Sequence, residues 1–219
     1  MKNAVIINLK HYEISSGKSC ERFLSSFIGM DIPENIRVVF ALNPIDLRIA
    51  RDFPELEFYS QHVDPVSYGA FTSKISIESL MDMGISGSIL NHSENRLNKE
   101  NISKTLDRAY RMGFPIVVCS ENLVEAGEYS KLRPEFIAYE PPELIGGNVS
   151  VTSSKPEIIR DAVNLCSANN VPVLVGAGIK NNDDFAKSLE LGAHGVLVAS
   201  GIVLSKDPLM SLNSLIEKL

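Results

Sequence analysis

The chain has 219 residues, of which 44% are hydrophobic and 22% charged, and a formal net charge of −6. These proportions exclude disordered and fibrous proteins, and the negative charge argues against a nucleic-acid partner. No apolar run approaches the roughly 18 residues needed to span a bilayer, and Cys20, Cys119 and Cys166 lie far apart, so we expect a cytoplasmic protein with reduced thiols and no membrane association.

Apolar runs of strand length recur along the chain. Most are continuous and rich in Val and Ile, which is typical of parallel strands buried on both faces. In chain order they are Ala4–Leu9, Ile36–Leu42, Leu56–Tyr59, Ser88–Leu90, Ile116–Cys119, Phe136–Tyr139, Val171–Val175 and Gly195–Ala199.

Helical patterns lie between these runs. Apolar residues recur at spacings of three and four in two segments: Ile102, Leu106 and Ala109, and then Ile158, Ala162 and Leu165. A glycine that can adopt the left-handed cap conformation follows three of the predicted helices, at Gly84, Gly113 and Gly192.

The alternation of strands and helices indicates an α/β fold with a parallel sheet, open or closed. The strand count favours closure into a (β/α)8 barrel, although 219 residues is below the roughly 250 that are typical of such barrels. Some helices must therefore be short, and Pro44–Phe53 is a candidate. No linker or low-complexity tract divides the chain, so we expect one compact domain over residues 1–219.

Polar and small residues follow several of the predicted strands. In a closed barrel the carboxyl ends of the strands meet at one mouth, where the chemistry of such barrels takes place. The segments are Asn8-Leu9-Lys10, Asn91-His92-Ser93-Glu94, Glu140-Pro141-Pro142, Gly176-Ala177-Gly178 and Ala199-Ser200-Gly201.

These residue types fit one kind of chemistry. The Glu140 carboxylate, held ahead of two prolines, can serve as a general base. His92 at the start of a helical turn would be kept neutral by the dipole, and a neutral imidazole can donate a hydrogen bond to a carbonyl. Lys10 and the backbone amides of the small-residue turns can hold a phosphate. The sequence predicts proton transfer beside a carbonyl on a small phosphorylated substrate.

Taken one at a time, the same residues have simpler interpretations. Glu140 is also typical of a solvated loop, His92 of a locally bonded helix start, and Lys10 of a surface cation. No His follows Glu140 and Glu143 at metal-ligand spacing, so we expect no metal site.

Five segments, in this order, resemble the triosephosphate isomerase family, particularly its shorter archaeal form. The similarity covers almost the whole chain. The segments are Ile7–Lys10, Leu90–Arg96, Tyr139–Gly146, Val175–Ile179 and Gly195–Gly201.

The resemblance implies a TIM barrel that interconverts dihydroxyacetone phosphate and D-glyceraldehyde 3-phosphate through an enediol, in glycolysis and gluconeogenesis, without a cofactor. It implies that Glu140 is the base and His92 the electrophile, a pairing known for this family, and that Lys10 is a third catalytic residue held by Glu94. The substrate-binding positions that it implies are Asn8, Leu9, Lys10, Ile145, Gly146, Gly178, Ala199 and Ser200.

The loop after Glu140 departs from the family pattern. It contains Gly146-Gly147-Asn148-Val149 where the family usually has Gly-Thr-Gly. Adjacent glycines raise the entropic cost of ordering a loop, while Asn tolerates left-handed backbone better than most residues. The departure therefore bears on how fast this lid closes and how well it excludes water.

A second loop bears on assembly. Gly69-Ala70-Phe71-Thr72 resembles the family's third-strand loop, which docks into a partner subunit. The resemblance thus implies a homodimer or a homotetramer, although an ordinary surface turn is the simpler interpretation of these four residues.

Two alternative functions stay open at this point. Other phosphate-binding barrels, such as phosphoribosyl isomerases and thiamine-phosphate synthases, share the glycine-rich turns but do not require Asn8, Lys10, His92 and Glu140 in this order. The other alternative is a non-catalytic barrel that binds phosphosugars, against which the presence of both a base and an electrophile argues.

Overall fold

The structure is a computed structural model that describes residues 2–141, 156–179 and 181–217. Its parallel strands close into one barrel in chain order, because β1 pairs with both β2 and β8. The strands are β1 (Asn3–Asn8), β2 (Ile36–Leu42), β3 (Phe58–Ser60), β4 (Gly87–Leu90), β5 (Ile116–Ser120), β6 (Phe136–Tyr139), β7 (Val173–Val175) and β8 (Gly195–Val198). The predicted (β/α)8 barrel is confirmed, although β3 and β7 each begin two residues later than expected.

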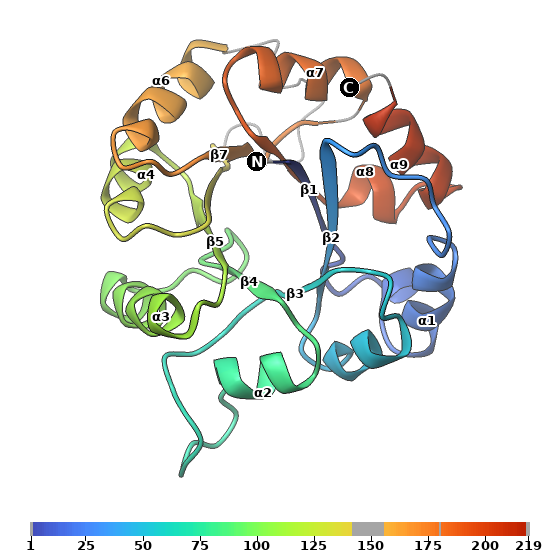
Figure 1. Cartoon of the computed structure of the whole chain (residues 1–219), viewed down its shortest axis with the longest axis horizontal. Helices are drawn as coiled ribbons and strands as arrows, with labels where there is room; N and C mark the ends of the chain where they lie inside the picture. The colour runs from blue at the N-terminus through green and yellow to red at the C-terminus, as the bar shows by residue number, and fades with distance from the viewer. Residues whose placement is uncertain (1, 142–155, 180, 218–219) are drawn as a thin grey trace.

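Helices surround the ring of strands, and the segment between β3 and α2 projects away from the body (Figure 1). In the described residues they are η1 (Glu13–Ser15), α1 (Lys18–Ser25), η2 (Leu47–Asp52), α2 (Ile77–Asp82), α3 (Lys99–Met112), α4 (Leu123–Ser130), α6 (Pro156–Ser167), α7 (Asn182–Glu190), α8 (Ser200–Val203) and α9 (Pro208–Ile216). The expected shortening occurs at η2, a six-residue 3-10 helix. None of the described helices is long and apolar enough to cross a membrane.

Helix α3 shows how the sequence sets these elements. Its buried residues include Ile102, Leu106 and Ala109, the apolar positions predicted to share one face. The Asn98 side chain accepts a hydrogen bond from the Asn101 N–H at the first turn, and Gly113 ends the helix with left-handed backbone.

Helix α6 covers the segment in which the spacing of apolar residues predicted a helix. Ile159, Ala162 and Cys166 are fully buried, whereas Leu165 is 40% exposed. Ile158 is partly buried against the core, and Leu165 lies at the edge of the buried face. The small Cys166 occupies a core position, and its thiol lies 3.7 Å from the Ala126 carbonyl oxygen on α4.

Alternate residues of each strand point to two different cores. The outward side chains pack against the helices in one large cluster. The inward side chains fill the barrel with a second, smaller cluster: Ala4, Ile6, Val39, Ala41, Tyr59, Ile89, Val117, Cys119, Phe136, Ala138, Leu174 and Leu197. The barrel is therefore a packed support beneath the strand ends.

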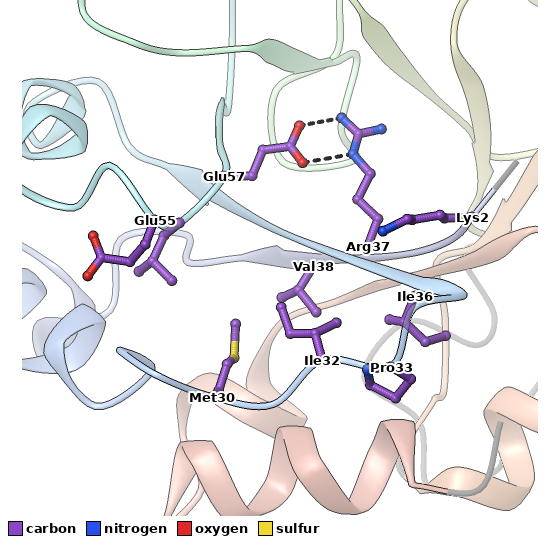
Figure 2. Close-up of a pocket in the computed structure, with 10 residues that line it drawn as sticks. Lys2, Met30, Ile32, Pro33, Ile36, Arg37, Val38, Glu55 and Glu57 are labelled. Atoms are coloured by element: carbon purple, nitrogen blue, oxygen red, sulfur yellow. Dashed lines mark hydrogen bonds and ion pairs between the residues drawn. The ribbon is translucent and has the colours of Figure 1, made fainter.

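An ion-pair network lies at the amino-terminal end of the barrel. Arg37 forms hydrogen bonds with both carboxylate oxygens of Glu57, at 2.9 and 2.5 Å, and with Glu135 at 2.6 Å. The Tyr59 hydroxyl donates to Glu135 and accepts from Arg37. A cavity of about 350 Å³ beside this network is lined by groups of both signs, among them Lys2 and Glu55 (Figure 2). This end of a barrel contributes stability, and the candidate site lies at the other.

Candidate active site at the carboxyl ends of the strands

The predicted polar residues meet at the barrel mouth. A continuous series of contacts joins the ends of β1, β4 and β6. The Lys10 ammonium lies 2.6 Å from the Glu94 carboxylate, and Glu94 Oε2 lies 3.7 Å from His92 Nδ1. His92 Nε2 in turn lies 3.6 Å from Glu140 Oε1. The convergence expected from strand order is therefore present in the structure.

Lys10 is held in an unusual backbone conformation directly after β1. Its φ is +48°, and its N–H donates to Asn8 Oδ1 at 3.0 Å. Its carbonyl accepts a hydrogen bond from Gln61 Nε2 at 3.0 Å, and the same amide donates to the Ala41 carbonyl. These contacts compensate for a conformation that is costly for a non-glycine residue, and they aim the ammonium across the mouth at Glu94.

His92 is arranged as a neutral donor. The Glu94 backbone N–H donates to His92 Nδ1 at 3.2 Å, so the neutral ring carries its proton on Nε2, the nitrogen nearest Glu140. Burial is the first cause that lowers the His92 pKa; Lys10 lowers it further, and Glu94 opposes the change.

Burial, a cause that lowers the His92 pKa, was not predicted from the sequence. His92 begins a turn closed by the Asn95 N–H on the His92 carbonyl, and α3 starts only at Lys99. The turn predicted at His92 is therefore a short one that ends before α3 begins. Loss of hydration in the mouth disfavours the imidazolium.

Glu140 directly follows β6 and is 6% exposed. Burial raises the pKa of its carboxyl group to about 7, while the Cys119 thiol and Lys10 act in the opposite direction. Within the described residues its Oε2 has no hydrogen-bond partner. A buried carboxylate with a pKa near neutrality and an unsatisfied oxygen can take up a proton at that position.

The turns after β7 and β8 supply neighbouring backbone groups. The two strands pair at Val175 and Val196, so their carboxyl ends are adjacent. Gly178 has a φ of +72° in the first turn. In the second turn Ala199 directly precedes α8, which begins at Ser200. The other two positions expected to bind substrate, Ile145 and Gly146, lie outside the described residues, as does the departure at Gly147-Asn148.

Leu9 does not share this arrangement. Its side chain is fully buried in the outer core. Its N–H donates to the Ala41 carbonyl, and its own carbonyl accepts from the Ser15 hydroxyl. Leu9 continues the outward-facing residues of β1 and packs under the helices. Its side chain therefore does not face the mouth, and Leu9 is not part of the site.

Two residues that contact the site were not predicted from the sequence. Gln61 holds the Lys10 carbonyl from the end of β3, and Cys119 lies inside the barrel beside Glu140. The position of Gln61 two residues after the predicted strand Leu56–Tyr59 was the one available signal. His62 also gains a partner, because its Nε2 lies 3.4 Å from Asp64 Oδ1.

The described residues contain no group of His, Cys, Asp and Glu side chains that could hold a metal ion. In the described part of the mouth lie a buried carboxylate, a neutral imidazole, the Lys10 ammonium and two amide-bearing turns. Together with the fold, this set defines a barrel enzyme of the acid–base class.

Comparison with known proteins narrows that class. The family model described as triosephosphate isomerase matches residues 3–218. The chain is 54% identical to the triosephosphate isomerase of Thermoplasma volcanium over 213 residues, which is 97% of this chain and 99% of the relative. It is 37% identical to that of Methanothermobacter thermautotrophicus, covering 98% and 94%, and 35% identical to that of Saccharolobus solfataricus, covering 93% and 90%. The chain belongs to the triosephosphate isomerase family and is an isomerase.

Proposed function

We propose that the chain interconverts dihydroxyacetone phosphate and D-glyceraldehyde 3-phosphate, in glycolysis and gluconeogenesis, with Glu140 as base and His92 as electrophile. The observation that carries this proposal is the 3.6 Å separation of His92 Nε2 and Glu140 Oε1. The Glu140 carboxylate, which can accept a proton from a substrate carbon, and the His92 Nε2–H, which can donate to a substrate oxygen, therefore lie side by side at the mouth.

The proton movements follow from these two groups. The Glu140 carboxylate removes a proton from the carbon beside the carbonyl, and the C–H electron pair becomes the C=C bond of an enediol. The carbonyl oxygen takes the proton from His92 Nε2. Glu140 then returns its proton to the former carbonyl carbon, while the neighbouring hydroxyl returns a proton to His92 and becomes the new carbonyl. No cofactor is required, because the carbonyl itself acidifies the transferred proton.

Lys10 and the turns after β7 and β8 supply the phosphate contacts in this proposal. With a net charge of −6, the protein has no overall attraction for an anion, so binding depends on local groups. The Lys10 ammonium, held by Glu94, supplies a point charge near the mouth. Backbone N–H groups at Gly178, Ala199 and Ser200 can donate to phosphate oxygens; Asn8 fixes the Lys10 backbone.

We also propose that the chain forms a homo-oligomer, a dimer or a tetramer, through the projecting loop between β3 and α2. Tyr68 and Phe71 on this loop are 68% and 52% exposed. Its base is closed by Asp64, which lies 2.9 Å from the Lys74 ammonium and accepts the Ile75 N–H at 2.9 Å. A preformed loop with exposed aromatic side chains supports docking onto a second copy. The cytoplasm, where buried reduced thiols such as Cys119 persist, is the proposed location.

A coupled assay of the purified protein with glyceraldehyde 3-phosphate tests the activity. We expect turnover without added metal or organic cofactor. An absence of isomerisation by pure, folded protein would overturn the proposed function.

A further inference from the structure

Asn91, between β4 and His92, has a conformation that needs an explanation. Its φ is +62°, and it is 2% exposed. Left-handed backbone is unfavourable for any residue with a Cβ, although Asn tolerates it better than most. Surrounding contacts must therefore maintain this conformation.

The Asn91 side-chain amide supplies those contacts. Its Nδ2 donates to the Cys119 carbonyl on β5 at 2.9 Å, and its Oδ1 accepts the Leu97 backbone N–H at 2.9 Å. Both partners are backbone groups of fixed polarity, so only one orientation of the amide satisfies them. The amide thus ties the far end of the segment 92–97, which carries His92 and Glu94, to the neighbouring strand.

The anchor point connects this segment to the base. Cys119 lies in the interior cluster, and its thiol is close enough to Glu140 for each group to affect the pKa of the other. The residue whose carbonyl holds Asn91 therefore also contacts Glu140, and the residue after Asn91 places its Nε2 3.6 Å from Glu140 Oε1. One buried amide therefore joins the segment that carries His92 to a residue beside Glu140.

We propose that Asn91 is a positioning residue for the isomerisation, which holds the His92 ring with its Nε2 proton directed at the site beside Glu140. This inference rests on the roles proposed above for His92 and Glu140. Asn91 acts through its neighbours and does not itself face the substrate.

The segment has a second, independent attachment. Arg96 contacts the Glu125 carboxylate on α4, lies 3.7 Å from Glu121, and donates to the Asn91 carbonyl at 3.4 Å. Loss of the Asn91 amide would leave these ion pairs in place. We therefore expect the segment to stay folded while the His92 ring loses its fixed orientation.

Asn91→Gly is the informative substitution, because glycine adopts the left-handed backbone without strain and removes only the two amide hydrogen bonds. We expect kcat to fall about 10- to 100-fold, the scale of a small misplacement of a catalytic group, with little change in KM. The matched control is Asn170→Gly, since Asn170 also has a positive φ, +58°, in the loop before β7. Its kcat is expected to stay at the parent value.

Nitrogen NMR of protein with labelled histidine supplies a readout that does not depend on turnover, with His92→Gln identifying the resonances. The parent should show one neutral tautomer with the proton on Nε2, and Asn91→Gly should show averaged tautomers. An unchanged His92 signature, or a parent-like kcat in Asn91→Gly, would overturn the inference. A raised KM with unchanged kcat would also overturn it, because that pattern marks a purely structural role.

If Asn91→Gly does not fold, the kcat of Asn91→Asp tests the inference. It keeps the acceptor for the Leu97 N–H and loses the donor to the Cys119 carbonyl, so the same loss of kcat is expected; a parent-like kcat contradicts the inference. The proposed function fails separately, if the parent protein itself does not isomerise the triose phosphate.

Discussion

Gly176 lies directly against the side chain of Glu140. A Cβ atom added at Gly176 would be 2.3 Å from Glu140 Cγ and 3.0 Å from its carboxyl carbon. The backbone of Gly176 is fixed as well, because its N–H donates to the Tyr139 carbonyl at 3.0 Å. Gly176, directly after β7, therefore limits the space available to the side chain of Glu140, directly after β6.

Gly176→Ala should displace the Glu140 carboxylate. A 2.3 Å contact with Cγ of a buried side chain cannot be relieved without a shift, so we expect kcat to fall by up to about 10²-fold. Steady-state kinetics with both triose phosphates measure this. Gly127→Ala, on α4, is the control, because its Cβ would meet the 40% exposed side chain of Leu165 on α6. Equal kcat values for Gly176→Ala and the parent would remove this packing role.

Replacement of Glu140 should make stability less dependent on pH. The pKa of this carboxyl is raised by burial from 4.5 to about 7, so between these values the folded state binds more protons than the unfolded state. Stability is therefore lost as the pH rises through this window, and the cost is complete above it. Glu140→Gln removes the cost, which is about 3 kcal/mol for a shift of this size.

Urea denaturation at pH 4 and pH 8 tests this expectation. The free energy of unfolding of Glu140→Gln should match that of the parent at pH 4 and exceed it at pH 8. If the difference is the same at both values, burial of the ionised carboxylate is not the source of the effect.

Lys10→Met should weaken the binding of phosphate-bearing ligands. One hydrogen bond to a charged group contributes about 1.5–3 kcal/mol, so the inhibition constant of inorganic phosphate should rise roughly 10- to 100-fold. Lys99→Met is the control, because Lys99 pairs with Glu128 on the outer surface of the helices. Equally tight phosphate inhibition in Lys10→Met would contradict the electrostatic part of the proposal.

The projecting loop should control assembly. Replacing both Tyr68 and Phe71 with Ser removes two exposed aromatic side chains, and the dissociation constant of the oligomer should rise by at least about 30-fold, the scale of one interface hot spot. Light scattering during gel filtration, over a range of concentrations, measures the mass. Met210→Ser, at a 66% exposed position on α9, should leave the mass unchanged. A parent-like mass for the double variant would place the interface elsewhere.

The sequence predicted the features that follow from local patterns. Continuous Val- and Ile-rich runs indicated the strands, and the order of polar residues after them indicated that Lys10, His92 and Glu140 would meet. Contacts across the barrel could not be predicted from the sequence. Three contacts join residues that belong to different strands or follow different strand ends. They are the fit of Gly176 against Glu140, the bridge from Asn91 to Cys119 and the hydrogen bond from Gln61 to Lys10. Their spacing along the chain carries no signal of that contact.

The buried face of α6 shows the same limit at one helix. Ile158, Ala162 and Leu165 have helical spacing, and so do Ile159, Ala162 and Cys166. Periodicity alone cannot choose between two phases when a small thiol competes with a leucine. The packing of Cys166 beside α4 determines which face of α6 is buried.

The kcat of Glu140→Gln tests the central claim most directly. An amide of the same shape cannot accept a proton from carbon, so we expect kcat to fall about 10²- to 10⁴-fold, the contribution of a general base, while circular dichroism shows a folded barrel. Glu100→Gln, which alters only a surface pair with Lys104, should keep the parent rate. A Glu140→Gln protein that isomerises at the parent rate would show that Glu140 does not carry the proton.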